Sequence, residues 1–110
     1  MAVYANEDGT IKNLTDITNT GFTKITMGII GSKGIISKNV GFTIKHCLFI
    51  GIKESGGNSY PEIQSNTFAV DSGSIYVGGY DYANVSFSGT TISYSNNSSS
   101  NRNVVYIAFG

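Results

Sequence analysis

The 110-residue chain is 40% hydrophobic and 12% aromatic, only 13% of its residues are charged, and seven basic residues balance seven acidic ones. This length fits one domain, and a neutral chain without a basic stripe is not typical of a protein that binds nucleic acid or a membrane surface. One cysteine excludes an internal disulfide, the longest apolar run is far too short to insert into a bilayer, and no secretion signal follows Met1.

Helix-forming patterns are scarce along the whole sequence. Apolar residues do not recur at helical spacing, and fourteen glycines are spread through the chain. Each glycine would cost a helix interior about 1 kcal/mol relative to alanine. β-Branched and aromatic residues dominate instead, and these favour strands. We therefore expect an all-β protein.

The first twenty residues contain few large apolar side chains. Residues 3–5 and 10–12 flank a turn that holds Asp8 and Gly9, a pair that supplies the positive φ of a tight hairpin. We predict that residues 1–20 form an N-terminal hairpin, arm or attachment segment. Residues 21–110 are then the compact body of the domain.

Two strands are predicted next, at residues 22–30 and 35–37. The segment between them, 31–34, reads Gly-Ser-Lys-Gly but lacks the full spacing of a phosphate-binding loop, and no helix pattern follows it. We interpret this segment as the turn of a hairpin. Residues 39–41 mark the following turn.

The strongest strand pattern covers residues 42–53. With the two-residue period of a strand, one face carries Ile44, His46, Leu48, Ile50 and Ile52, and the other carries Lys45, Cys47, Phe49 and Gly51. Both faces are largely apolar in the middle. This pattern predicts a central strand that is covered on both sides.

The second half of the chain alternates short strands with polar breaks. Strands are predicted at residues 62–70, 74–78, 84–88, 90–95 and 104–109, and loops at 54–61, 79–83 and 96–103. Val85 and Phe87 share one face of their strand, and Ile92 and Tyr94 form the matching face of the next strand. About eight short strands with turns between them predict an antiparallel β-sandwich or a jelly-roll-like barrel.

Few residues suit catalysis or metal binding. His46 is the only histidine, and its neighbour Cys47 would point to the opposite face of a strand, so the two do not form a nucleophilic pair. One chain also lacks clustered metal ligands, although a trimer offers the alternative of three His46 side chains at an axis. The acidic residues lie in separate loops and are not paired. We expect no catalytic residue, no metal, no cofactor and no enzymatic activity.

Binding is the function class that remains. Tyr60, Tyr80 and Tyr82 lie in segments predicted to be glycine-rich loops. Tyr60 is close in sequence to Asn58, and Tyr80 and Tyr82 are close to Asp81 and Asn84. A tyrosine ring offers a flat apolar surface on which a sugar ring stacks, while Asn and Asp bond sugar hydroxyls. The three tyrosines, Asp81 and Asn84 are the predicted ligand-binding site. The alternative for the tyrosines is packing at a rim or between subunits.

Two segments resemble a known group of proteins. Residues 39–45, Asn-Val-Gly-Phe-Thr-Ile-Lys, run into Leu-Phe-Ile at 48–50 and resemble a recurring step in the C-terminal tip domains of bacteriophage tail-fibre proteins, which bind receptors. The last five residues, Tyr-Ile-Ala-Phe-Gly at 106–110, resemble the strand that ends such tips. Ile44 stands where these domains usually have proline.

The resemblance covers residues 21–110 and implies a viral protein, a virion component of the tail of a phage or prophage. It implies a homo-oligomer, commonly a homotrimer, that is made in the host cytoplasm and binds a host-surface glycan or docks on other phage tail proteins. Low charge and strands that are apolar on both faces fit subunit packing. The alternative function is a free-standing bacterial lectin-like carbohydrate-binding module.

Overall fold

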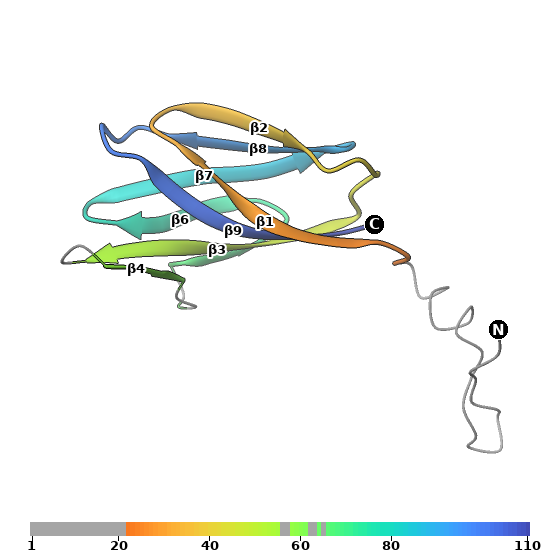
Figure 1. The fold of residues 1–110 in the computed structure, drawn as a ribbon, viewed down its shortest axis with the longest axis horizontal. Helices are drawn as coiled ribbons and strands as arrows, with labels where there is room; N and C mark the ends of the chain where they lie inside the picture. The colour runs from red at the N-terminus through yellow and green to blue at the C-terminus, as the bar shows by residue number, and fades with distance from the viewer. Residues whose placement is uncertain (1–21, 56–57, 62–63, 65) are drawn as a thin grey trace, which may run out of the picture.

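The computed structural model describes residues 22–55, 58–61, 64 and 66–110, which form nine strands and no helix (Figure 1). The strands are β1 (Ile25–Ser32), β2 (Ile35–Asn39), β3 (His46–Ser55), β4 (Asn58–Pro61), β5 (Phe68–Val70), β6 (Gly73–Gly78), β7 (Asp81–Ser88), β8 (Thr91–Asn96) and β9 (Arg102–Phe109). The all-β prediction is confirmed, with nine strands where about eight were expected. The predicted arm at residues 1–20 lies outside the described residues.

Two antiparallel sheets lie against each other as a β-sandwich (Figure 1). The first sheet has the order β1-β9-β3-β4, and β5 pairs with β3 on the same side as β4. The second sheet has the order β2-β8-β7-β6. The predicted antiparallel sandwich is therefore confirmed.

The core lies between the sheets and is built by alternate residues of each strand. Val85 lies opposite Tyr94 and Phe87 opposite Ile92 in the pairing of β7 with β8, as the sequence pattern predicted. The largest fully buried side chains come from both sheets: Phe49, Val104 and Cys47 from the first, and Ile75, Val77, Ile92 and Tyr94 from the second. Burial of these inner faces stabilises the sandwich.

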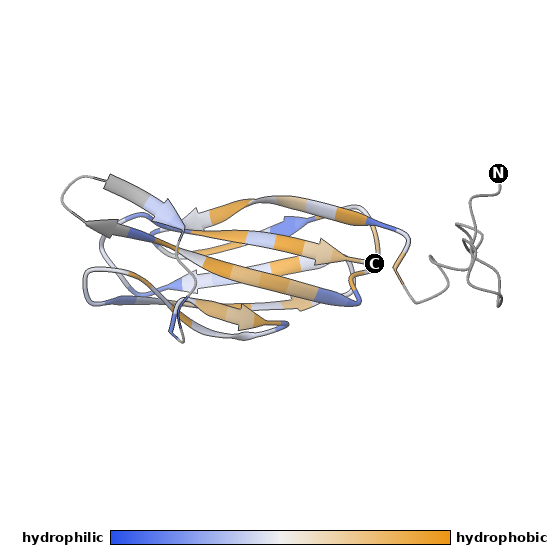
Figure 2. Ribbon diagram, turned by 90° about the horizontal axis from the view of Figure 1, so that it is seen from below, coloured by the Kyte–Doolittle hydropathy of each residue, from blue (hydrophilic) through white to orange (hydrophobic). Residues whose placement is uncertain are grey.

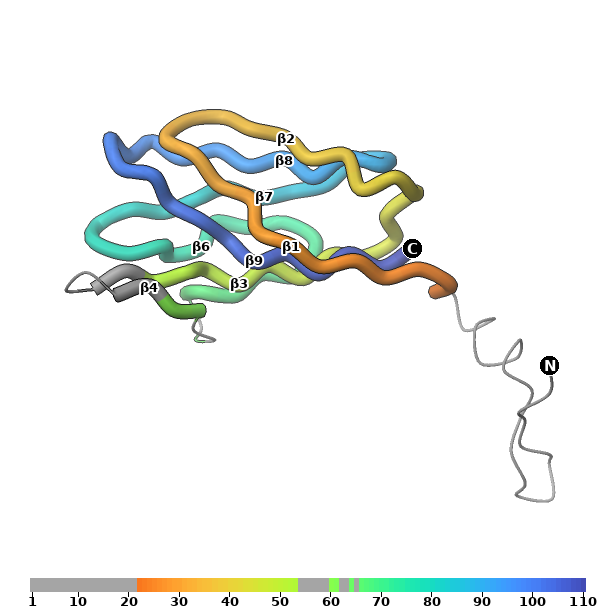
Figure 3. Tube along the Cα trace, in the orientation of Figure 1, coloured from red at the N-terminus to blue at the C-terminus, as the bar shows by residue number. Residues whose placement is uncertain are grey.

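The segment 31–34 does not close a hairpin, contrary to the prediction. β1 pairs with β9 in the first sheet and β2 pairs with β8 in the second, so the chain crosses between sheets here (Figure 3). Asn96 of β8 holds the crossing: its side-chain amide donates to the Ser32 carbonyl (3.1 Å) and its backbone N–H donates to the Gly34 carbonyl (3.0 Å). The hydrophobic pattern of a strand does not identify its pairing partner, which is why the prediction failed.

The strand predicted at residues 42–53 begins only at His46. The preceding residues are irregular, and the Ile44 N–H donates to the Gly89 carbonyl in the β7–β8 turn (2.9 Å). The Ile44 side chain is consequently buried in the core instead of sharing a face with the exposed His46. Within the described chain β3 is covered only on its inner face, and the expected cover on its outer face is not seen.

Two predicted loops contain strands. β4 occupies the second half of the predicted loop 54–61 and pairs with the end of β3. β7 begins at Asp81, so the predicted loop 79–83 shrinks to a turn at Gly79 and Tyr80, where Gly79 has a φ of +57°. Within the described residues of 62–70, only β5 is a strand.

The outward surface of the first sheet is apolar. Successive paired positions place on one side Ile25, Met27 and Ile29 of β1, Val105, Ile107 and Phe109 of β9, Leu48, Ile50 and Ile52 of β3, and Phe68 and Val70 of β5. We name this set the apolar face. Its β1 side chains remain 64–69% exposed, and hydrophobic segments run along the strands (Figure 2).

The two segments that carry the resemblance meet at one end of the sandwich. Gly110 is buried, its N–H donates to the Lys24 carbonyl (2.9 Å), and its carbonyl accepts from the Thr23 N–H (2.7 Å). Its Cα lies against the Phe42 ring and the Thr43 carbonyl, where an added Cβ would overlap both. The segment that precedes β3 therefore packs on the residue that follows β9.

Candidate functional site

The outward surface of the second sheet is lined mainly by hydroxyl and amide groups, and the exposed Ile35 of β2 is an apolar exception. The hydroxyl and amide groups belong to Ser37 and Asn39 of β2, Thr91, Ser93 and Ser95 of β8, Tyr82, Asn84, Ser86 and Ser88 of β7, and Ser74 and Tyr76 of β6. We name this set the hydroxyl face. It follows from the alternation that builds the core, because Ala83 and Val85 of β7 point inward and are buried. The two sheets thus present opposite chemistries on their outer surfaces.

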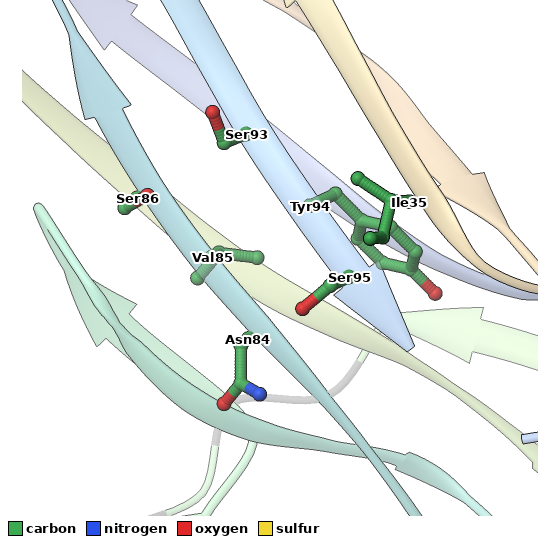
Figure 4. Close-up of a pocket in the computed structure, with 7 residues that line it drawn as sticks. All are labelled: Ile35, Asn84, Val85, Ser86, Ser93, Tyr94 and Ser95. Carbon is green, nitrogen blue, oxygen red and sulfur yellow. The ribbon is translucent and has the colours of Figure 1, made fainter. Parts of the chain in front are cut away.

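A pocket of about 290 Å³ opens on the hydroxyl face (Figure 4). It is lined by Ile35, Asn84, Val85, Ser86, Ser93, Tyr94 and Ser95, which come from β2, β7 and β8. Ligand pockets usually measure about 300–1,000 Å³ and are lined mainly by apolar side chains, so this pocket lies at the lower limit of that range. The lining combines apolar surface with serine and asparagine groups, which suits a small unit such as one sugar ring.

Two predicted site residues, Tyr82 and Asn84, lie on the hydroxyl face. Both point outward from β7, and Asn84 lines the pocket. The Tyr82 ring is 48% exposed and packs edge-on against Tyr76, with ring centroids 5.6 Å apart. The Tyr76 hydroxyl in turn donates to the Gly79 carbonyl (2.9 Å). The Tyr82 ring is thus held in place by Tyr76, and it lies on the same face as the Asn84 amide that lines the pocket.

The other two predicted tyrosines lie elsewhere. Tyr60 belongs to β4 in the first sheet, opposite Lys53. Tyr80 lies in the β6–β7 turn and is fully exposed. Neither residue lines the pocket. The structure therefore brings together Tyr82 and Asn84 but not the whole predicted set.

Asp81, also predicted as a ligand-binding residue, is bonded within the chain. Its Oδ2 accepts from the Ser98 hydroxyl (2.6 Å) and from the Arg102 Nε–H (2.7 Å). The Ser98 hydrogen bond first, and then Arg102, lower the pKa of Asp81 below its usual value. This carboxylate ties the start of β7 to the β8–β9 connection. These two hydrogen bonds indicate that Asp81 stabilises the fold rather than contacts a ligand.

We expect Asp81→Asn to lower the stability of the fold at neutral pH. We also expect the variant to lose less further stability than the wild type when the pH falls into the acid range. Because the folded-state pKa is depressed, the carboxylate stabilises the fold above its unfolded pKa of about 3.9. That contribution is lost as the pH falls through the folded-state pKa. Urea unfolding followed by circular dichroism at about pH 7, 5 and 3 measures the effect. Wild-type stability at pH 7 together with an unchanged pH slope would contradict this role for Asp81.

A histidine–carboxylate pair lies at the end of the apolar face. His46 Nδ1 is 2.9 Å from Asp71 Oδ2, and the Cys47 N–H donates to Asp71 Oδ1 (2.9 Å). The Phe22 ring packs edge-on against His46 with a centroid distance of 5.8 Å. The Cys47 N–H first, and then His46, lower the pKa of Asp71. Sequence reasoning missed this pair, because the partners lie far apart in the chain and in different strands or loops.

A histidine–carboxylate pair also occurs in the active sites of hydrolases, but there a nucleophile completes the site. In such enzymes a carboxylate orients the histidine and a nucleophile lies at the other ring nitrogen. No hydroxyl or thiol in the described part of the chain is hydrogen-bonded to His46. Cys47 is buried, and burial is the main cause that raises the pKa of its thiol to about 12.

Metal binding has no support within the described ranges, where no three potential ligands among His, Cys, Asp and Glu form a group. The alternative of three His46 side chains at a trimer axis concerns an oligomer and stays a prediction. None of the described segments is a helix with the length and apolarity that crossing a membrane requires.

Ile35, Ser86, Ser93 and Ser95 line the pocket and were not predicted. The signal for the three serines was present in the alternation of β7 and β8, which places them on the side away from the core. Comparisons with protein-family models, with curated proteins and with solved structures found no match to the chain. Function is therefore inferred from the chemistry of the two outer surfaces and from the residue-level resemblance.

Proposed function

We propose that this protein is a non-enzymatic tail-fibre component of a phage or prophage whose hydroxyl face binds a glycan on the host surface. The observation that carries the proposal is the exposed Tyr82 ring beside Asn84 and the serine-lined pocket. The resemblance of residues 39–45 and 106–110 to fibre tips supports a place in the virion. It also favours assembly into a homotrimer and contact with other tail proteins.

The chemistry of the hydroxyl face suits a neutral sugar. One face of a pyranose ring is apolar enough to stack on an aromatic side chain such as Tyr82. Side-chain hydroxyls and amides both donate and accept, as sugar hydroxyls do, and Asn84, Ser86 and Ser93 supply such groups at the pocket. One small site binds weakly, but several copies on one particle raise the overall affinity through multivalency.

Tyr82→Ala is expected to weaken glycan binding by about tenfold or more, which equals about 1.4 kcal/mol, because the stacking surface is lost. The full chain is first screened on a glycan array, and binding of the best glycan is then measured by titration calorimetry. Asn84→Ala should weaken the same interaction. The matched control is Tyr60→Ala, which removes a similarly exposed tyrosine from the other sheet and should leave binding unchanged.

Two results would redirect the proposal. If the chain binds no host glycan or host cell, and its removal instead prevents tail assembly, its role is purely structural. If Tyr60→Ala abolishes binding while Tyr82→Ala does not, the ligand lies on the first sheet. Tail genes beside the coding gene would favour the virion component over the free-standing bacterial lectin.

A further inference from the structure

We propose that copies of this chain pack against one another through the apolar face. The inference deepens the self-association within the proposed function by naming the surface, and it does not depend on glycan binding by the opposite sheet. β9 and β3 are apolar on their outer side as well as on their inner side, and the outer side of β1 continues the same apolar surface. A sheet that is apolar on both sides requires a second layer over its outer surface.

Four side chains of the apolar face are more than half exposed. Met27 is 69% exposed, Ile25 and Ile29 nearly as much, and Val70 52%. The partly exposed members on β3 and β9 join these side chains into one continuous apolar patch. Contiguous exposed apolar patches of this kind mark interaction surfaces.

The chemistry of the face favours a second copy over an unrelated partner. Along the outward positions of β1, β5, β9 and residues 46–52 of β3, His46 is the only ionisable side chain. Interfaces between identical subunits are the more apolar class and resemble a core cut in half. Two copies of this surface match without any charge complementarity, because apolar contacts have no direction. The zero net charge of the chain adds no long-range repulsion.

The edge of the same sheet gives independent support. Among the described strands, β1 is the last of its sheet, and it reads Ile-Thr-Met-Gly-Ile-Ile-Gly-Ser, without a charge or a proline. Solitary proteins usually protect such an edge with lysine, proline or a bulge. The pairing of β1 with β9 is regular over its whole length. An unprotected edge beside an exposed apolar face is consistent with a position inside an assembly.

The test compares two substitutions that place the same charge on opposite sheets of the full-length chain. Met27→Asp changes the apolar face on an edge strand, and Ser93→Asp changes an exposed outward position of the hydroxyl face. Sedimentation velocity from about 1 μM to 1 mM should show an oligomer for the wild type and for Ser93→Asp. Met27→Asp should weaken association at least 30-fold, as expected for a buried hot spot. Circular dichroism confirms that both variants keep the fold.

A thiol-protection measurement gives a second readout, because the native Cys47 is buried. Met27→Cys should react slowly with a maleimide at high protein concentration and faster after dilution, whereas Ser93→Cys should react at one rate throughout. A wild-type chain that stays monomeric would overturn self-association altogether. An oligomer that Met27→Asp does not disperse would overturn only the assignment of the face. Loss of glycan binding by Tyr82→Ala is a separate result and bears on neither outcome.

Discussion

Gly51→Ala is expected to destabilise the fold by about 3 kcal/mol, the upper end of the usual cost of overpacking a core. Gly51 lies on the inner side of β3, and its Cα faces the Tyr76 carbonyl oxygen of β6, which an added Cβ would overlap. Its N–H also donates to the Thr67 carbonyl (2.7 Å). The obstacle is backbone in the opposite sheet, so a side-chain rotation cannot relieve it. Urea unfolding followed by circular dichroism measures the loss.

Gly34→Ala is the matched control for Gly51→Ala. No atom lies within 4 Å of a Cβ added at Gly34, and its φ is not positive. Alanine there should be neutral or should stabilise by about 0.4–1 kcal/mol, because the unfolded chain loses conformational freedom. Equal effects of the two substitutions would show that the sheets do not approach closely at Gly51.

The strands were predictable because their pattern is local, but their partners were not. The alternation of Val85 and Phe87 with Ile92 and Tyr94 matched, since β7 and β8 are neighbours in sequence and in space. β1 instead pairs with β9 at the far end of the chain. Nothing in residues 31–34 distinguishes a turn within one sheet from a crossing between two. Long-range pairing is decided by the whole core and not by the turn.

The candidate site was predictable in part for the same reason. Tyr82 and Asn84 were identified by residue type, and both lie on the hydroxyl face. Asp81 has the same local signature, but Arg102 and Ser98 reach it from distant parts of the chain. Serines at outward positions of a strand are common on any protein surface. Only the pairing of β7 with β8 shows that these serines line one pocket.

Phe49→Ala is expected to be the most damaging side-chain truncation in the core. Phe49 is fully buried on the central strand β3 and is among the largest fully buried side chains. Removing the ring loses its burial and leaves a cavity between the sheets, at a cost of about 3–5 kcal/mol. Tyr80→Ala removes an aromatic ring that is fully exposed, and its effect should stay within about 0.5 kcal/mol. Urea unfolding of both variants under identical conditions gives the difference.

Ile50→Ala extends the test to the other side of the same strand. Ile50 follows Phe49 directly, lies opposite Val105 of β9, and points to the apolar face, where it is half-buried. Its truncation should lower the unfolding free energy less than Phe49→Ala does, because no described element covers it. It should also weaken association where copies pack on this face, whereas Phe49→Ala acts on the fold of each copy. If Ile50→Ala destabilised as strongly as Phe49→Ala at concentrations where the chain is monomeric, the outer side of β3 would already be covered within one chain.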